Sequence, residues 1–327
     1  MQKADKDMQV IHPWVAEGSQ KIRVGLSFLG PCTDWKQYSS WVQTAEELGF
    51  DSYWLPDHPA ILSDCWTTLA ALAVTTSRIR LGTLVNCIFY RNPVLLARMA
   101  ADVDRLSGGR LILGLGMGDL PFEFTQMGIP YAGTQERQEA LEETIQVLRG
   151  LWGTQPFTYK GKYTQVDQCF LPVGPVQQPR VPLLIAGGGE RVTLRQVAQY
   201  ADASNFGPHR DTGSAFNVED VVRKCNVLCA HCEELERPVD AVLRTHITIP
   251  LVMGETQATI AAKQEAAPSY LRDPFLSSEI AVTPSEAIEY YNALIQVGIQ
   301  YFIITLWQND LETLQMLAHQ VIPALIS

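Results

Sequence analysis

The sequence predicts an α/β protein of the (β/α)8 barrel class, and three observations lead to that prediction. Largely apolar segments of strand length alternate with segments of helical periodicity along the whole chain. About eight such strand–helix pairs occur, which is the count that a closed barrel of this class requires. Polar and glycine-rich residues gather just after the strands, at the edge where parallel α/β folds bind ligands.

The expected elements follow one another in a regular order. We expect strands at residues 21–29, 50–55, 79–84, 110–115, 181–186, 201–206, 241–252 and 301–306. Helices are expected between them at residues 35–48, 65–76, 94–106, 134–151, 192–200, 218–236, 284–297 and 311–325, with Asp64 and Thr134 as N-caps of two of them. Apolar strands joined by helices imply a parallel sheet that is buried on both faces.

The chain is expected to form a single domain over residues 21–327, preceded by a polar, loosely held leader over residues 1–20. Two stretches break the strand–helix alternation. Residues 153–180 contain a candidate hairpin and a proline-rich return, and residues 254–283 have no regular pattern. We interpret both as insertions at the C-terminal face of the barrel, because each is too short for a core of its own. Residues 120–133 are expected to form a long loop.

Composition narrows the possible partners. The 327 residues are 46% hydrophobic and 18% charged, and 25 basic against 35 acidic residues give a net charge of −10. An acidic chain without a basic cluster argues against nucleic acid or anionic membranes as partners. No apolar run reaches the roughly 18 residues of a membrane span, and the N-terminus lacks the apolar core of a signal peptide. We therefore expect a cytoplasmic protein.

The seven cysteines are scattered and odd in number, which does not indicate a disulfide framework. Cys225, Cys229 and Cys232 have the C-x3-C-x2-C spacing of an iron–sulfur site. They fall on a predicted helix, however, whereas cluster ligands normally lie on a loop. We expect them to be packing residues and expect no metal site.

Two acidic or titratable residues at strand ends are candidates for proton transfer. His58 follows the second strand together with Asp57, and histidine is the side chain best suited to move a proton near neutral pH. The alternative is that His58 merely satisfies a loop carbonyl. Asp119 follows the fourth strand and is either a second acid or a cap for the following loop.

Glycines follow two strands in patterns that suit a ligand. Gly116 and Gly118 would let the backbone pass close to a flat ring. Gly187, Gly188 and Gly189 lie between a strand and a helix, where free N–H groups bind anions, and Arg191 can add a charge-assisted bond to phosphate. A plain tight turn is the alternative, but it does not require three successive glycines.

These residues occur in segments that resemble the luciferase-like flavin and deazaflavin oxidoreductases. The matching segments are LGTLV (81–85), YRNP (90–93), SGGR (107–110), LGLGMG (113–118) and GGGER (187–191), within a similarity that covers about residues 22–325. The resemblance implies a TIM barrel that binds FMN or the deazaflavin coenzyme F420. The triple-glycine segment, with Thr193-Leu194-Arg195 after it, is more similar to the F420-dependent branch.

The resemblance also implies roles for individual residues. Asp57 and His58 match a pair that supplies the base for the hydroxyl proton of the substrate, with His58 as the base and Asp57 expected among the residues that bind the coenzyme. A non-prolyl cis peptide is implied at Thr83-Leu84 or Leu84-Val85, where a bulge supports the coenzyme ring, and Asn86 could hydrogen-bond the polar edge of that ring. Asp119 stands where the family has a glutamate that serves the N1 side of the coenzyme.

We therefore predict an oxidoreductase that transfers a hydride between coenzyme F420 and a small organic substrate. The main alternative is an FMN-dependent monooxygenase that uses reduced flavin and O2. Two further alternatives are a non-catalytic flavin-binding barrel and a divalent-metal enzyme that uses Asp57, His58 and Asp119. Because relatives of this kind are often dimers, the resemblance is also compatible with a homodimer.

Overall fold

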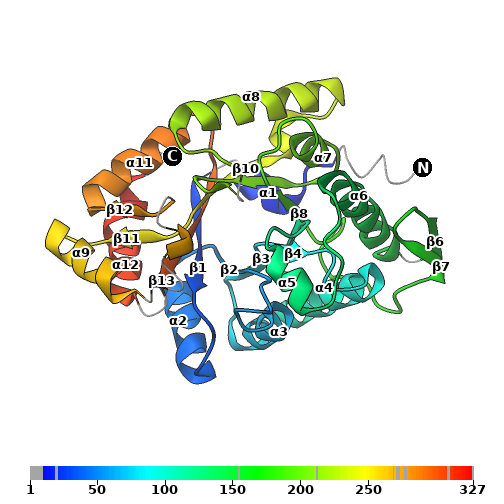
Figure 1. Cartoon of the computed structure of the whole chain (residues 1–327), viewed down its shortest axis with the longest axis horizontal. Helices are drawn as coiled ribbons and strands as arrows, with labels where there is room; N and C mark the ends of the chain where they lie inside the picture. The colour runs from blue at the N-terminus through cyan, green and yellow to red at the C-terminus, as the bar shows by residue number, and fades with distance from the viewer. Residues whose placement is uncertain are drawn as a thin grey trace.

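The fold is a closed barrel of parallel strands surrounded by helices, seen in a computed structural model that describes residues 10–18, 21–153, 155–210, 213–267, 269, 273–275, 278–307 and 310–325 (Figure 1). The barrel strands are β1 (Arg23–Leu29), β2 (Ser52–Leu55), β3 (Arg80–Thr83), β5 (Leu111–Gly116), β8 (Leu183–Ala186), β9 (Ala203–Phe206), β10 (Leu243–Thr248) and β13 (Tyr301–Trp307). All neighbours pair in parallel, and β13 pairs with β1 to close the ring. The predicted (β/α)8 barrel is confirmed.

Helices connect successive strands, as the apolar periodicity predicted. They are α2 (Trp35–Glu47), α3 (Cys65–Thr75), α4 (Pro93–Ser107), α6 (Thr134–Leu151), α7 (Thr193–Tyr200), α8 (Val218–Glu234), α11 (Pro284–Gln296) and α12 (Leu311–Met316). Asp64 caps α3 by accepting a hydrogen bond from the Thr67 N–H, as predicted. The prediction for α6 was wrong, because its N-cap is Gly133 and no side chain caps it. The last expected helix continues from α12 as a π-turn and a 3-10 turn to Ala324.

Apolar side chains fill two layers. Trp54, Ile112, Leu184, Leu243 and Ile303 are buried inside the barrel. A larger cluster lies between the outer faces of the strands and the helices. The interior is crowded, because a Cβ atom on Gly82 would lie 2.3 Å from the Trp54 ring. The barrel is therefore a packed core rather than a channel, and only its ends can hold a site.

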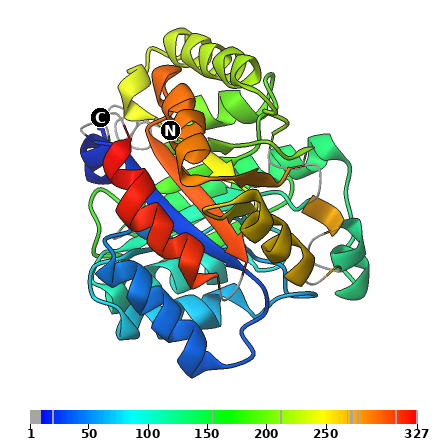
Figure 2. The same ribbon diagram turned by 90° about the vertical axis from the view of Figure 1, so that its left-hand side faces the viewer.

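One expectation fails at the N-terminal end of the barrel. The expected loose leader contains helix α1 (Pro13–Gly18), and its Trp14 is only 3% exposed. The Trp14 ring packs edge-on against Tyr301 at 5.9 Å, and its carbonyl accepts a hydrogen bond of 2.8 Å from Arg23. Arg23 and Tyr301 are the first residues of β1 and β13, so α1 covers the N-terminal end of the barrel. Figure 2 shows α1 at the end of the barrel opposite the arrowhead of β13. The sequence did not predict this contact, because polar side chains are frequent in residues 1–20.

The two predicted insertions have regular structure. Antiparallel strands β6 (Phe157–Lys160) and β7 (Gln165–Cys169) form the expected hairpin, which projects beside α6 (Figure 1). The expected strand over 241–252 is interrupted at the cis Ile249–Pro250 bond. Its second part, β11 (Leu251–Met253), leaves the barrel and pairs with β12 (Ile280–Val282). The stretch expected to be irregular also contains α9 (Gln257–Ala266).

The prediction of a long loop over residues 120–133 was only partly right. It contains a short helix, α5 (Pro121–Gln126), which begins with proline at its first turn. This helix follows β5 and carries Glu123 and Phe124, both fully buried. Within the described residues, no helix has both the length and the apolar character to cross a membrane.

Candidate active site

The predicted functional residues meet at one rim because all barrel strands run in the same direction. Asp57 and His58 follow β2, Asn86 follows β3, and Asp119 follows β5. The triple-glycine turn follows β8, the next neighbour of β5. The C-terminal ends of these neighbouring strands thus bring together residues that are far apart in the sequence. This is the rim at which barrels of this class carry their active sites.

Asp57 is an internal anchor of the rim. Its side chain is buried, and its Oδ2 accepts a hydrogen bond of 2.6 Å from Arg91 Nη1 and one of 3.2 Å from the Cys87 N–H. Its Oδ1 accepts a hydrogen bond of 3.3 Å from the Cys65 thiol. Both oxygens are therefore engaged by the protein. Direct contact between Asp57 and a coenzyme stays a prediction.

His58 is held by a carboxylate that sequence reasoning missed. Its Nδ1 lies 2.8 Å from Oε2 of Glu123, and its side chain remains 26% exposed while the glutamate side chain is fully buried. Burial lowers the pKa of His58, but the hydrogen bond to Glu123 and the charges of Asp119, Glu123 and Asp57 outweigh it and raise the pKa above 6.5. The partly exposed imidazole is therefore a stronger base than an ordinary histidine side chain.

Glu123 is in turn fixed by other groups. Its Oε2 accepts a hydrogen bond of 3.0 Å from the Tyr90 hydroxyl, and its Oε1 accepts one of 3.4 Å from the Ala60 N–H. The only signal in the sequence is a glutamate between two phenylalanines, which is unusual in a loop exposed to water. Because His58 and Glu123 are 65 residues apart, only the barrel topology brings them together.

Asp119 lies near enough to His58 for its charge to contribute to the raised pKa of the imidazole. Its side chain is exposed at the rim. The preceding backbone is held from α6 by Arg137, which donates hydrogen bonds to the carbonyls of Met117 and Gly118. A catalytic role for Asp119 stays a prediction.

The strand-end bulge predicted from the resemblance is present, with the cis peptide bond at Leu84–Val85. Thr83 Oγ1 donates a hydrogen bond of 2.7 Å to the Gly114 carbonyl, which ties the bulge to β5. A Cβ on Gly116 would lie 2.5 Å from Val85 Cγ2. The protein itself therefore requires a glycine at position 116, whether or not a ring also passes there.

Asn86 and Gly118 also have partners within the protein. Asn86 is fully buried, and its Oδ1 accepts a hydrogen bond of 2.8 Å from Trp66 Nε1, whereas its Nδ2 has no partner among the residues that the structure describes. Gly118 has a φ of +74° and packs against Phe124, so a side chain there would be strained and crowded. Contacts of either residue with a coenzyme stay predictions.

The triple-glycine turn connects β8 to α7 at this rim. Gly187 has a φ of +110°, and its N–H donates to the Asn205 carbonyl at 2.9 Å. The N–H groups of residues 188–193 find no acceptor among the described residues. Lys224 of α8 lies beneath the turn and donates a hydrogen bond of 2.7 Å to the Gly188 carbonyl. Arg191 is exposed beside it.

The metal alternatives gain no support from side-chain placement. Across the described ranges, no three His, Cys, Asp or Glu side chains are grouped as metal ligands. Cys225 and Cys232 are buried on α8, as expected for packing residues, and Cys229 is half-buried on the same helix.

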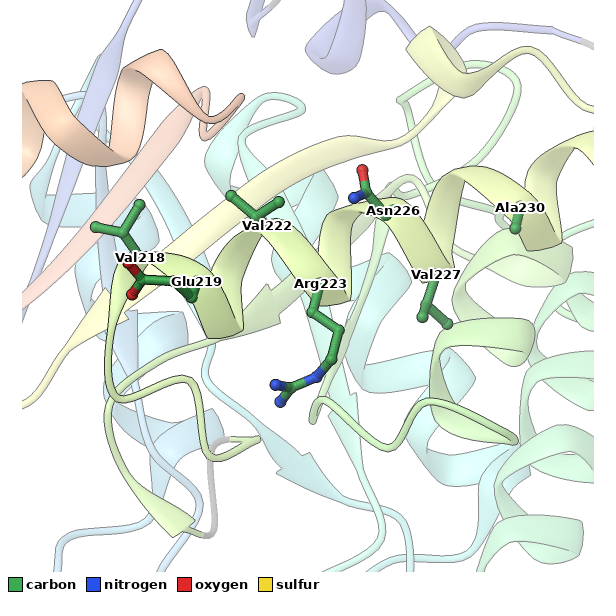
Figure 3. A pocket seen from close by; sticks show the side chains of 7 residues that line it. All are labelled: Val218, Glu219, Val222, Arg223, Asn226, Val227 and Ala230. Carbon is green, nitrogen blue, oxygen red and sulfur yellow. The ribbon is translucent and has the colours of Figure 1, made fainter.

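One hollow in the described surface lies on a helix outside the barrel. It is a shallow groove along α8, and Figure 3 shows that this one helix supplies the labelled side chains, Val218, Glu219, Val222, Arg223, Asn226, Val227 and Ala230. No histidine and no strand end contributes to it. We therefore place the active site at the C-terminal rim, where position and chemistry agree.

Eight parallel strands that close into a ring and are surrounded by helices place the fold in the TIM-barrel class. Residues 14–276 match the model of the luciferase-like monooxygenase family, and the chain belongs to that family.

Relatives in the family include enzymes of two kinds. The F420-dependent glucose-6-phosphate dehydrogenase of Amycolatopsis mediterranei is 26% identical over 319 residues, which covers 86% of this chain and 92% of that protein. The pyrimidine monooxygenase RutA of Escherichia coli is 37% identical over 158 residues, covering 47% of this chain and 46% of RutA. Mycobacterial relatives are 29% identical over 181 residues, and the chain spans 63% of their length.

A solved structure agrees with the fold. The coenzyme F420-dependent tetrahydromethanopterin reductase from Methanopyrus kandleri superposes with a TM-score of 0.78 at 20% identity. The match covers 94% of this chain and 100% of that one. It supports the barrel and the arrangement of its helices.

Proposed function

We propose that the protein is an F420-dependent oxidoreductase that moves a hydride between the deazaflavin and a small organic substrate. The observation that carries this proposal is the shared rim of His58 and the triple-glycine turn. One supplies a base and the other supplies N–H groups for a phosphate. The similarity to an F420-dependent dehydrogenase over 86% of the chain supports the same conclusion.

The residues present fit such a coenzyme. The N–H groups of residues 188–193 lack acceptors, and Arg191 is exposed beside them, so the turn suits the coenzyme phosphate. The bulge at Leu84–Val85 lies at the end of β3 and suits the face of a flat ring. When bound, the deazaflavin would accept or donate the hydride.

The protein's own contribution to the reaction would be proton transfer and positioning. His58 would take the hydroxyl proton of the substrate through Nε2, because Nδ1 is already engaged by Glu123. Asp119 would place a second carboxyl group near the base. The packed barrel beneath the rim would keep water away from one side of the site.

A second candidate function is an FMN-dependent monooxygenase. The 37% identity to RutA over 158 residues supports it, and over a stretch of similar length an F420-dependent glucose-6-phosphate dehydrogenase is 35% identical. Both candidates use the same rim, so the choice of coenzyme separates them.

Coenzyme binding tests the proposal. The purified protein is titrated separately with oxidised F420 and with FMN, and fluorescence is followed. Micromolar or tighter binding of F420 with weaker FMN binding is the expected result. Tight binding of FMN without binding of F420 would replace the proposal with the monooxygenase.

The role of His58 is tested by His58→Ala. We expect turnover to fall by roughly 10²–10⁴-fold, the usual contribution of a general base, with F420 affinity nearly unchanged. His319 is an exposed histidine on the C-terminal π-turn, so His319→Ala is the matched control and should keep full turnover. Equal turnover of the His58→Ala variant and the wild type would show that His58 is not the base.

A further inference from the structure

The histidine at the rim has two ring nitrogens, and the structure assigns them different surroundings. Nδ1 faces Glu123 Oε2 at 2.8 Å. Nε2 has no hydrogen-bond partner in the described part of the chain. It is also not one of the buried polar atoms that lack a partner, so it is accessible at the surface. Together with the partial exposure of the ring, this leaves Nε2 as the nitrogen available to a substrate.

Glu123 is placed as a part of the site rather than as an ordinary packing residue. A fully buried carboxylate is costly unless its oxygens are satisfied. Here three groups from two segments satisfy it, namely His58 and the Ala60 N–H in the loop after β2, and Tyr90 before α4. Helix α5 has six residues, and it places the carboxylate of Glu123 against the histidine ring.

We propose that Glu123 is a positioning residue that keeps His58 in the tautomer with the proton on Nδ1, so that Nε2 can accept the substrate proton. Tyr90 completes the arrangement by fixing the carboxylate. This inference rests on the proposed function for the step that it serves, but the pairing itself does not depend on the identity of the coenzyme.

The proposed step balances as an alcohol oxidation. The O–H bond of the substrate would break and its proton would go to His58 Nε2. The hydrogen on the carbon that bears this oxygen would leave with two electrons as a hydride, which the oxidised deazaflavin would accept when bound. The C=O bond forms from the remaining electrons. His58 then carries a positive charge, which the carboxylate of Glu123 stabilises at 2.8 Å.

Other charged groups also surround His58 and must be considered. Asp119 lies on the loop after β5, Asp57 precedes His58 on its own loop, and Tyr90 faces Glu123. Asp57 is ion-paired with Arg91, which offsets its charge. Among these groups, only Glu123 is hydrogen-bonded to the ring, so its replacement should change the titration of His58 most.

The test compares Glu123→Gln with the wild type in two readouts. The first is the pKa of His58, followed by NMR in the protein without coenzyme, and we expect it to fall in the variant because the charge is lost. The second is the pH profile of kcat/KM with F420, where we expect a loss of roughly tenfold or more and a matching shift of the limb that reports His58. Gln126→Ala, an exposed change on the same helix, should alter neither readout.

Tyr90→Phe gives a second test with the opposite sign, and it serves if Glu123→Gln does not fold. Removal of the Tyr90 hydroxyl takes a donor from Glu123 Oε2, so the carboxylate becomes more basic and the pKa of His58 should rise. An unchanged pKa of His58 in the folded variants would overturn the proposal. Because the NMR titration needs no coenzyme, failure of the F420 assignment would leave its result intact.

Discussion

The bulge at the rim leaves no room for a side chain at Gly114. A Cβ atom at this position would lie 2.0 Å from the Thr83 carbonyl oxygen, next to the bond at Leu84–Val85. The sequence suggested that Gly116, two residues later, leaves room for a ligand. The structure supplies a second reason, since Val85 already occupies the space beside Gly116. Glycine in this strand thus has a packing role that a sequence pattern cannot separate from a binding role.

Gly114→Ala should therefore destabilise the protein. We expect a loss of roughly 1–3 kcal/mol or more in the free energy of unfolding, because the crowding atom is backbone and cannot rotate away. Urea denaturation measures the change. Gly174→Ala is the matched control, because its nearest atom is a carbonyl oxygen at an ordinary 3.5 Å and its φ is not positive. It should change stability by less than about 1 kcal/mol. Equal losses in both variants would refute the packing argument.

At the level of elements, the long periodic segments were predictable and the short ones were not. The barrel strands and connecting helices were placed within a few residues, because each repeats its apolar pattern over at least a full turn or strand. Helix α5 has only six residues, which is too short for a helical period to show. The strand expected over 241–252 read as continuous because its apolar residues continue past Pro250 into β11.

The same limit applies to the site. His58, the bulge and the glycine turn were found because they follow strands, and strand ends are visible in the sequence. Glu123, Tyr90 and Lys224 were missed because their importance depends on a partner across the rim. A helix that closes the opposite end, α1, was missed for a related reason, since Trp14 is its only strongly apolar large residue.

Trp14→Ala tests whether α1 is a structural part of the barrel. The indole is 3% exposed against the interior cluster, so we expect a loss of about 3–5 kcal/mol in the free energy of unfolding. Ile11→Ala is the control nearby, because Ile11 is 40% exposed. Urea midpoints of the two variants should differ clearly. A tryptophan variant as stable as the control would mean that α1 does not close the barrel in solution.

Across the whole molecule, charged side chains occur in different settings at the two ends of the barrel. The C-terminal rim holds a half-exposed histidine and its carboxylates. Near the N-terminal ends of the strands, a buried ion pair joins Arg180 Nη2 to Asp202 Oδ1 at 3.0 Å. Such a pair is strongly destabilising when one partner is lost, because the other remains buried and charged. Protonation of the Asp202 carboxylate should therefore lower the free energy of unfolding of the whole protein in acid.

Asp202 predicts the sign of that pH dependence. Burial would raise its pKa, but the charge and hydrogen bonds of Arg180 outweigh burial and lower it from 3.8 to about 2. A lowered carboxyl pKa adds stability above the unfolded value, and this is lost as pH falls from about 4 to about 2. The free energy of unfolding, measured over this range, should fall less steeply in Asp202→Asn than in the wild type. Parallel curves would contradict the assignment.

Under the proposed function, helix α5 limits how the substrate range could be redesigned. This helix carries Glu123, so libraries that randomise residues 121–126 would remove the carboxylate that is hydrogen-bonded to His58 together with its exposed neighbours. Helix α9 carries neither residue. It is anchored through Lys263, which donates hydrogen bonds to Asp310 and to the Met253 carbonyl, each at 2.8 Å. Directed evolution that keeps this lysine and varies its exposed neighbours on α9 would leave Glu123 and His58 unchanged.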